Sequence, residues 1–441
     1  MKRLLLLFIV PFSSPTHAQA PRLDAAVRAY VSPFADAGDF SGVALVMHGD
    51  TVLGQVAAGE AEPGRPVTLN TRFRIASVTK PFTAAAVLRL ITQGLISLTS
   101  SVCEQLQPCP EAWRPITIRH LLSHTAGIPN YTSFPDFAAT QAQATTPDAL
   151  VARFSEMPLE FAPGTRYAYS NSGYAVLGRV IESVTGQAYA DALRSLVLAP
   201  LGIVGVHYGD EAGDALGYRP IIGGREPADA LDMSVPYAAG ALVASASEVA
   251  AFARGYFRSS GFLPDSIRML ALTPVQGSYG LGWMTASLGP GRSASHTGSI
   301  HGFVAFLAYR PDVDVTVVVL ANVERAPAQR MALDLVRMAD GVAVAPPTIR
   351  RAVPLPEADL DAVVGTYRLD SASDFVVRRA AGGGLEVQAT GQRPVPIFAE
   401  RRDAFFARAV NAQFTFERDG AGRVIRMVLY QGGRAMTAER L

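Results

Sequence analysis

The sequence predicts an α+β fold, in which helices flank an antiparallel sheet, a helical subdomain is inserted in the middle, and an all-β barrel forms the C-terminal part. Three features of the chain predict this arrangement. Strand-like alternation brackets the first part of the chain, helical periodicity fills its middle, and short alternating segments follow a proline-rich stretch at 344–356. With 441 residues, 49% of them hydrophobic, the chain is long enough to bury two cores.

The first part of the chain contains the elements of the predicted sheet. Alternating apolar residues at 43–47 and 52–56, separated by a His-Gly-Asp turn, predict a β-hairpin. A capping box formed by Ser245 and Glu248 marks the start of a helix that we expect to run through Phe257. The other expected elements are helices at 77–95, 144–156, 173–186 and 326–338, and strands at 279–286, 292–297, 302–309 and 313–323. Strands at both ends, with helices between them, predict a sheet that the two ends complete together.

The C-terminal part has a different pattern. From Gly365 onward, about eight short alternating segments are separated by glycine-containing turns, which is typical of a small antiparallel barrel or sandwich. We therefore predict a larger α+β domain at 19–345 and a β-barrel domain at 346–441.

Residues 1–18 have the features of a secretory signal peptide. Lys2 and Arg3 precede the apolar run 4–10, a small-residue region follows, and we expect cleavage after Ala18. A periplasmic or secreted protein is therefore expected. No stable membrane anchor is expected, because no later segment reaches about 20 consecutive apolar residues.

The charge balance and the cysteine content bear on the partners and on the covalent structure of the protein. Without residues 1–18, 37 basic residues face 38 acidic ones and no basic run occurs, so we expect no nucleic-acid partner. The only cysteines, Cys103 and Cys109, are six positions apart in a proline-containing loop. An oxidising compartment permits a small-loop disulfide between them, and a pair of free thiols is the alternative. The sequence does not indicate an oligomeric state.

Lys80 is the only lysine outside the predicted signal peptide, and every other basic side chain there is arginine. A buried lysine can lose its proton and act as a base, which arginine cannot do. Lowering the lysine pKa from about 10.4 to near 7 or 8 requires roughly 3 to 5 kcal/mol, which burial in the apolar segment around it can supply. Because Ser77 precedes it by three residues, the two side chains share one helix face as a candidate nucleophile and base. The alternative is a helix-capping Ser77 and a surface Lys80.

Two further segments supply polar groups for such a site. Tyr169 and Asn171 alternate onto one side of an extended turn. A tyrosine can transfer protons if nearby cations favour the phenolate, and an asparagine can hold both a substrate carbonyl and the lysine. His296, Thr297 and Gly298 lie on a predicted strand, where polar side chains can bind the substrate and the glycine lets its backbone come close.

In this order, the motifs resemble those of the serine β-lactamase and penicillin-recognising enzyme superfamily, in its class C, DD-peptidase and esterase branch. The matching stretches, spread over roughly residues 30 to 340, are 73–80 (FRIASVTK), 118–128 (IRHLLSHTAGI), 169–171 (YSN), 279–283 (YGLGW) and 296–298 (HTG). The C-terminal part is similar to the lipocalin-like module that follows this domain in D-aminopeptidase and related hydrolases.

The resemblance also implies roles for individual residues. Ser77 would be the nucleophile that forms an acyl-enzyme, Lys80 and Tyr169 would share proton transfer, and Asn171 would position the substrate and the lysine. The backbone N–H groups of Ser77 and Ser299 would form an oxyanion hole. The resemblance further implies that His296, Thr297, Gly298 and Ser299 bind the substrate, and that the reaction needs no cofactor.

His296 departs from the pattern of the β-lactamases, which usually carry lysine at this position. A histidine with an unperturbed pKa would lose its hold on a substrate carboxylate as the pH rises past about 6.5. We therefore favour a peptidase, of the D-amino-acid or DD-carboxypeptidase type, or an esterase, acting on a small-molecule or peptide substrate. A class C-like β-lactamase and a non-catalytic penicillin-recognising binding protein are the alternatives.

Three other histidines are expected to be structural. His120 and His124 have the spacing of a zinc-binding helix, but Leu121 stands where a metalloprotease helix needs glutamate. We therefore expect no metal site. His301, which follows the HTG motif, is expected to have a packing role rather than to line a pocket.

Overall fold

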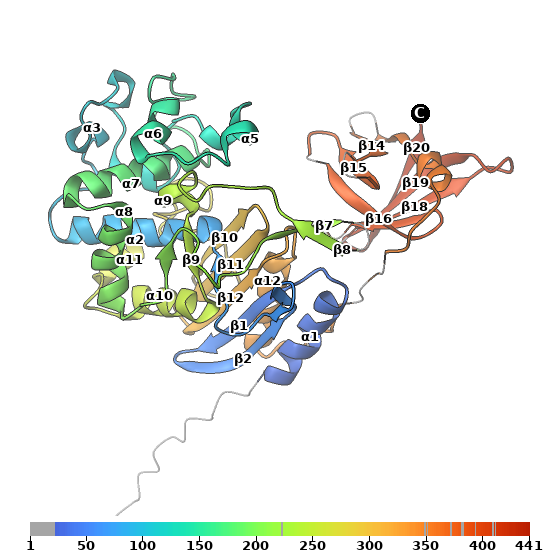
Figure 1. Ribbon diagram of the computed structural model, residues 1–441, viewed down its shortest axis with the longest axis horizontal. Coiled ribbons are helices and arrows are strands. Elements are labelled where there is room, and N and C mark those ends of the chain that lie inside the picture. Colours follow the sequence, from blue (N-terminus) through green and yellow to red (C-terminus); the bar gives the residue numbers. More distant parts are fainter. Residues whose placement is uncertain are drawn as a thin grey trace, which may run out of the picture.

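The computed structural model describes residues 23–441, apart from residues 222–223, 348–349, 351, 371–372, 381–382, 393, 408–409 and 411. The predicted signal peptide at 1–18 lies outside the described residues. Figure 1 shows a larger part built around a central sheet and a smaller β-barrel at the C-terminal end, with the hairpin of β7 (Tyr218–Ile221) and β8 (Gly224–Pro227) lying between them.

Five antiparallel strands form the central sheet, in the order β10-β11-β12-β1-β2. Their bounds are β1 (Gly42–His48), β2 (Thr51–Ala58), β10 (Ala294–Ile300), β11 (Phe303–Arg310) and β12 (Val315–Ala321). β1 pairs with β12 along its whole length, with Leu45 opposite Val318. The two ends of the α+β part therefore complete one sheet, and the predicted hairpin is confirmed as β1 and β2.

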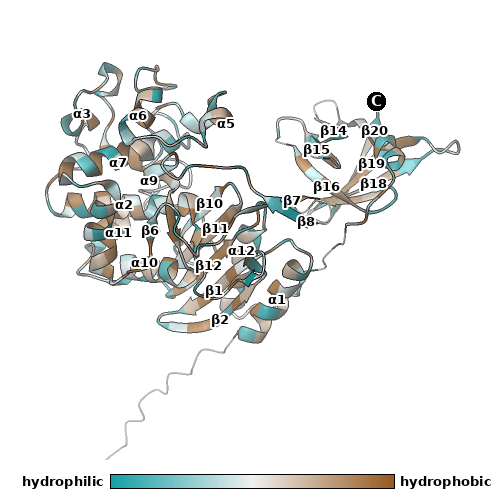
Figure 2. Ribbon diagram, viewed as in Figure 1, coloured by the Kyte–Doolittle hydropathy of each residue, from teal (hydrophilic) through white to brown (hydrophobic). Residues whose placement is uncertain are grey.

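Both faces of the sheet are buried, which follows from the alternation along β1. Val43 and Leu45 belong to one core, and Ala44 and Val46 belong to the other. Helices α1 (Asp24–Asp36) and α12 (Ala328–Ala339) pack on the side of Ala44, whereas α2 (Thr79–Thr92) and α10 (Ala246–Arg258) contribute to the core on the side of Val43. Figure 2 shows hydrophobic residues concentrated in these strands, where each buried valine or leucine stabilises the fold by roughly 1.5 to 3 kcal/mol.

A mostly helical region is inserted between the two halves of the sheet. Its helices are α3 (Val102–Gln105), α4 (Ile118–Leu122), α5 (Phe137–Thr140), α6 (Pro147–Ser155), α7 (Asn171–Thr185), α8 (Tyr189–Leu193), α9 (Tyr237–Gly240) and α11 (Asp265–Ala271), and its short strands are β3 (Glu60–Glu62), β4 (Arg65–Pro66), β5 (Phe73–Arg74), β6 (His207–Tyr208) and β9 (Leu242–Ala244). The helices expected at 77–95, 144–156, 173–186 and 326–338 correspond to α2, α6, α7 and α12. The capping box of Ser245 and Glu248 opens α10 as expected.

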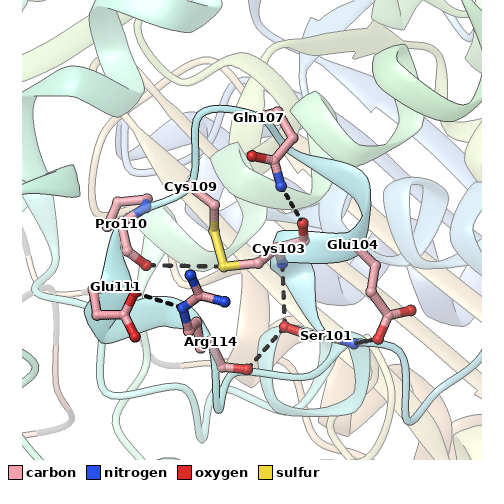
Figure 3. Close-up of a disulfide and its surroundings, with 8 residues drawn as sticks. All are labelled: Ser101, Cys103, Glu104, Gln107, Cys109, Pro110, Glu111 and Arg114. Carbon is pink, nitrogen blue, oxygen red and sulfur yellow. Dashed lines mark hydrogen bonds and ion pairs between the residues drawn. A yellow bond between two sulfur atoms is a disulfide. The ribbon is translucent and has the colours of Figure 1, made fainter.

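Cys103 and Cys109 form a disulfide, which decides between the two alternatives that the sequence left open. The bridge lies in a loop held by further hydrogen bonds (Figure 3). Ser101 caps α3 by accepting from the Cys103 N–H and donates its own hydroxyl to the Arg114 carbonyl. The amide of Gln107 donates to the Cys103 carbonyl. The disulfide therefore fixes an edge of the helical region.

The strand expected at 279–286 is wrong. Within this segment Tyr279 and Met284 form only isolated bridges, and the Gly280 N–H donates to the Trp283 carbonyl in a tight turn. Gly282 adopts φ 86°, a left-handed conformation that glycine reaches without strain. Tyr279, Leu281 and Trp283 are buried, but the backbone of this segment turns instead of continuing as a strand.

The C-terminal part is a closed antiparallel barrel of eight strands. Its strands are β13 (Gly365–Asp370), β14 (Ser373–Arg379), β15 (Leu385–Ala389), β16 (Val395–Arg401), β17 (Ala404–Ala407), β18 (Ala412–Arg418), β19 (Val424–Gln431) and β20 (Arg434–Arg440), preceded by α13 (Glu357–Ala362). Tyr367, Phe405 and Phe416 form part of a hydrophobic cluster that contains only residues of this C-terminal part. Among the described helices, none is both long and apolar enough to cross a bilayer.

Candidate active site

Ser77 and Lys80 lie where the chain turns from β5 into α2. Ser77 belongs to a 3-10 turn, η1 (Ala76–Val78), and α2 begins one residue before Lys80. Ala76 adopts φ 50°, a left-handed conformation that is strained for a residue with a side chain. Because the polypeptide changes direction sharply here, Ser77 sits at the start of the helix with its side chain only partly buried.

The amine of Lys80 lies at the centre of a buried polar cluster. Its Nζ is 3.0 Å from Ser77 Oγ, 2.8 Å from Asn171 Oδ1 and 2.8 Å from the carbonyl oxygen of Ala239. Lys80 has no exposed surface, and its Nζ also lies 4.8 Å from the centre of the Tyr169 ring. The sequence-based alternative of a surface lysine is therefore wrong.

Burial lowers the pKa of Lys80 well below its ordinary value. Every described group in contact with its Nζ is an uncharged hydroxyl, amide, carbonyl or aromatic ring, so no carboxylate restores the charged form. The site therefore favours the neutral amine.

Tyr169 also lies beside this cluster, with its ring close to the Lys80 amine. Burial raises the pKa of Tyr169 above its ordinary value, and the neighbouring Ser77 side chain lowers it by a smaller amount. The ring keeps some exposure, 37% for the residue as a whole. Near neutral pH Tyr169 is a phenol rather than the phenolate that the sequence interpretation considered.

Asn171 is the first residue of α7, and two neighbours orient it. Its backbone N–H donates to the Asn130 side chain, and its Nδ2 donates to Thr132 Oγ1 at 3.0 Å. With its amide nitrogen used in this way, Oδ1 faces Lys80. Asn130 and Thr132 were not found from the sequence, because nothing in their spacing connects them with Asn171.

The ring of His124 packs against the ring of Tyr169. The residue adopts φ 57°, is 2% exposed, and its Nδ1 accepts the backbone N–H of Ser170. Its ring centre lies 4.3 Å from that of Tyr169. Burial lowers the pKa of His124, and Lys80 adds a smaller effect in the same direction.

His120 accepts the N–H of Thr117 in a capping box. The described residues contain no group of three side chains that could hold a metal ion.

The expectation that His296 presents a titratable charge to the substrate is wrong. The residue is 1% exposed on β10, and burial lowers its pKa to about 3. Its Nδ1 lies 2.6 Å from the Thr297 carbonyl, which can only accept, so Nδ1 carries the proton. Its Nε2 therefore accepts from the Tyr279 hydroxyl at 2.9 Å. Both ring nitrogens are used, and the imidazole is neutral.

Gly298 has a packing role that the sequence did not indicate. A Cβ at this position would lie 2.3 Å from the carbonyl oxygen of Ile75 and 3.2 Å from the Ala76 side chain. The glycine thus makes room for the turn that carries Ser77, rather than only for a substrate backbone. Through this close packing of β10 on η1, Ser299 and Ser77 line the same cavity.

A cavity of about 400 Å³ opens beside Ser77. Both polar and apolar residues line it: Ala76, Ser77, Tyr131, Thr132, Phe137, Asn171, Leu231, Val235, Pro236, Ala239, Gly240, Ser299, Ile300, His301, Glu324 and Arg325. Among the predicted site residues, Ser77, Asn171 and Ser299 line it. Lys80, Tyr169 and His296 stand behind or beside this lining. His301 lines the cavity, so the packing role expected for it is wrong.

Comparisons with known proteins show which family the chain resembles. The model of the family described as Beta-lactamase matches residues 27–340. Penicillin-binding protein 4* of Bacillus subtilis (strain 168) is 26% identical over 438 residues, which cover 91% of this chain and 95% of that protein. Esterase EstB of Burkholderia gladioli is 37% identical over 182 residues, 36% of this chain and 45% of that protein.

A D-stereospecific amidohydrolase from Streptomyces sp. has a similar solved structure, with a TM-score of 0.61, 25% identity, and coverage of 73% of this chain and 100% of that one. The family match spans the central sheet, the inserted helices and all the polar groups around Lys80. On that extent of agreement, the chain belongs to the beta-lactamase family.

Proposed function

We propose that the protein is a serine hydrolase that forms an acyl-enzyme on Ser77, most consistent with a peptidase of the D-amino-acid or DD-carboxypeptidase type or with an esterase. The observation that carries this proposal is the environment of the Lys80 amine. Its three polar contacts are one hydroxyl and two carbonyl oxygens.

These three contacts match the needs of a neutral amine. A neutral amine has two N–H groups and one lone pair, and the carbonyl oxygens of Asn171 and Ala239 can only accept. Two N–H groups directed at these oxygens leave the lone pair facing the Ser77 hydroxyl. In this arrangement Lys80 accepts the proton of Ser77 as the serine attacks a carbonyl carbon.

Charge that develops on the attacked carbonyl needs donors already in place. The backbone N–H groups of Ser77 and Ser299 are the proposed oxyanion hole, supported by the positions of both residues in the lining of one cavity and of Ser77 at the start of a helix. Tyr169, as a phenol in contact with Ser77, is the proposed donor of a proton to the leaving group. Water then hydrolyses the acyl-enzyme by the same groups in reverse.

The choice of substrate class rests on His296. A permanent cation at this position helps β-lactamases hold the carboxylate of the drug, whereas His296 is neutral. A similar protein named as an esterase and a similar structure named as a D-stereospecific amidohydrolase support the peptidase or esterase alternative. A class C-like β-lactamase and a non-catalytic penicillin-recognising protein are the competing functions.

We also propose that the protein is exported. We place the protein in the periplasm or outside the cell, and the disulfide between Cys103 and Cys109 supports this, because such bridges persist in oxidising compartments. The proposed substrate is a small molecule or a peptide, and the proposed catalytic domain ends near residue 345.

Turnover of a chromogenic short-chain ester tests the proposed function. We expect hydrolysis by the wild type and none by Ser77→Ala, whereas the surface variant Ser247→Ala keeps the wild-type rate. A fluorophosphonate or penicillin should add its mass to the peptide that contains Ser77. An adduct on another residue would overturn the assignment of Ser77 as the nucleophile. No turnover at any pH would favour the binding-protein alternative.

A further inference from the structure

Among the residues that line the active-site cavity are charged side chains that the proposed catalytic groups do not explain. His301, Glu324 and Arg325 line the same cavity as Ser77 and Ser299. Glu324 Oε1 accepts the backbone N–H of Gly302 at 3.0 Å, which uses part of its hydrogen-bonding capacity. Arg325 is exposed and makes no ion pair or side-chain hydrogen bond with any described residue.

Arg325 is the single permanent cation among the described residues that line this cavity. Lys80 and His296 do not offer a charge to a ligand, because the amine is enclosed by its own partners and both imidazole nitrogens are bonded within the protein. Among the described lining residues, an anionic group in the cavity therefore has one cationic partner available, the guanidinium of Arg325.

The backbone keeps Arg325 at this cavity. The residue adopts φ 65°, a conformation that is unfavourable for an arginine and that the surrounding structure must hold in place. Glu324 and Arg325 also border a second, smaller cavity, whose other side includes Pro396 and Phe398 of β16. The segment thus lies between the active-site cavity and the barrel, and both sides limit its movement.

We infer that Arg325 is a specificity-determining residue that binds a free carboxylate of the substrate. The planar guanidinium matches a carboxylate through two parallel N–H bonds, a match that is stronger than a single point contact. Tyr131, Phe137 and Leu231 line the same cavity and give it apolar surface. The substrate class is therefore an acyl compound that carries both an apolar group and a carboxylate. This inference rests on the proposed function, because it assigns the substrate of the same site.

Two pairs of thiolester substrates test the inference. One pair carries the carboxylate on the leaving group, the other carries it on the acyl group, and each charged compound is compared with its methyl ester. The readout is the ratio of kcat/KM for the charged substrate to that for the methyl ester. We expect the wild type to favour the charged member of at least one pair, and Arg325→Gln to lower that ratio by about tenfold or more.

Two further variants separate a specific contact from a general effect of charge. Glu324→Gln keeps an acceptor for Gly302 but removes a negative charge, so it should raise the same ratio. Arg330→Gln removes a positive charge from α12, where Arg330 lies over the Phe34 ring and outside the cavity lining, and should leave the ratio unchanged.

The outcomes distinguish this inference from the proposed function. If the methyl esters are hydrolysed but the charged compounds are not favoured, or if Arg325→Gln and Arg330→Gln change the ratio equally, the assignment of Arg325 is overturned and the hydrolase proposal stands. If neither methyl ester nor charged substrate is hydrolysed by the wild type, the proposed function itself fails.

Discussion

The Tyr279 hydroxyl donates a hydrogen bond to Nε2 of His296, and both groups are buried behind the catalytic residues. This bond, together with the one from Nδ1 to the Thr297 carbonyl, fixes the ring in a single neutral form. The histidine of the HTG motif is thus a structural link between the turn at 279–283 and strand β10. His296 therefore helps to hold the site in shape and brings no charge to it. The positive charge at the cavity belongs to Arg325.

Replacing Tyr279 by phenylalanine should destabilise the protein by about 1 to 3 kcal/mol, because a buried acceptor on His296 loses its donor. Urea unfolding of the two proteins measures this difference. Tyr218→Phe is the matched control, since the Tyr218 hydroxyl is buried without a hydrogen-bond partner, and its removal should be neutral or stabilising. Equal losses in the two variants would contradict the assigned bond.

The pH dependence of acylation follows from the opposite pKa shifts of Lys80 and Tyr169. Acylation needs the neutral amine, so kcat/KM should rise with pH through the lowered pKa of Lys80 and then level off. Because burial raises the pKa of Tyr169, no descending limb from loss of its proton is expected below about pH 10. A bell-shaped profile that falls again near pH 8 would be inconsistent with these roles.

Lys80→Arg tests the same argument by mutation. Arginine keeps the charge but cannot become a neutral base, so the rate of Ser77 acylation should fall by at least about a hundredfold. Labelling with a fluorophosphonate, followed over time, measures this rate. Retention of more than about a tenth of the wild-type rate would show that Lys80 contributes charge rather than a lone pair.

Gly298→Ala should weaken both stability and catalysis. The added methyl would meet the Ile75 carbonyl oxygen at 2.3 Å, and strand β10 would have to move away from the turn that carries Ser77. Overpacking of this kind costs about 1 to 3 kcal/mol, and the separation of Ser299 from Ser77 should lower kcat. Gly261→Ala, where no atom lies within 4 Å of the added methyl, is the control. Wild-type kcat in a folded Gly298→Ala protein would show that this close packing is not needed.

Removing the disulfide should cost stability without changing the chemistry. Constraining the short loop between Cys103 and Cys109 is expected to contribute about 2 kcal/mol through the unfolded state. The double variant Cys103→Ser, Cys109→Ser should therefore unfold at lower urea concentration and keep the wild-type kcat/KM. Reductant should destabilise the wild type but not the variant. If reductant left the wild type unchanged, the lower stability of the variant would come from the serine side chains and not from loss of the disulfide.

The sequence was most informative where local chemistry and local pattern coincide. The spacing of Ser77 and Lys80, the capping box at Ser245 and the strand alternation at 43–47 each depend on neighbours within a few residues, and the structure contains the corresponding elements. By contrast, Arg325 lines the same cavity as Ser299 only because β10 and β12 finish at the same end of the sheet. No spacing in the chain encodes that proximity.

The pKa of His296 also could not be predicted from the sequence. An unperturbed histidine was the starting assumption, but burial and the partners Tyr279 and Thr297 are properties of the folded chain. The same holds for Gly298, whose neighbour Ile75 is more than 200 residues earlier in the chain. Residue types thus indicated the location of the site, and long-range packing determined its charge.

A chain ending at residue 345 should fold, because the barrel has a core of its own. The cluster around Tyr367 and Phe416 shares no member with the two cores that enclose the central sheet. Contact between the two parts includes a small cavity lined by Arg325 and Phe398, and Phe398 is not a member of the barrel cluster. The truncated protein should therefore show a cooperative thermal transition and a circular dichroism spectrum richer in helix than that of the full chain.

Hydrolysis of the charged and methyl-ester substrates by the truncated protein extends this prediction. Ester turnover depends on Ser77 and Lys80, which lie in the retained part, whereas the position of Arg325 is limited on one side by the barrel. We therefore expect the preference for the charged substrate to fall more than the turnover of the methyl ester. An insoluble truncated protein would instead mean that contact of the larger part with β16 of the barrel is needed for its folding.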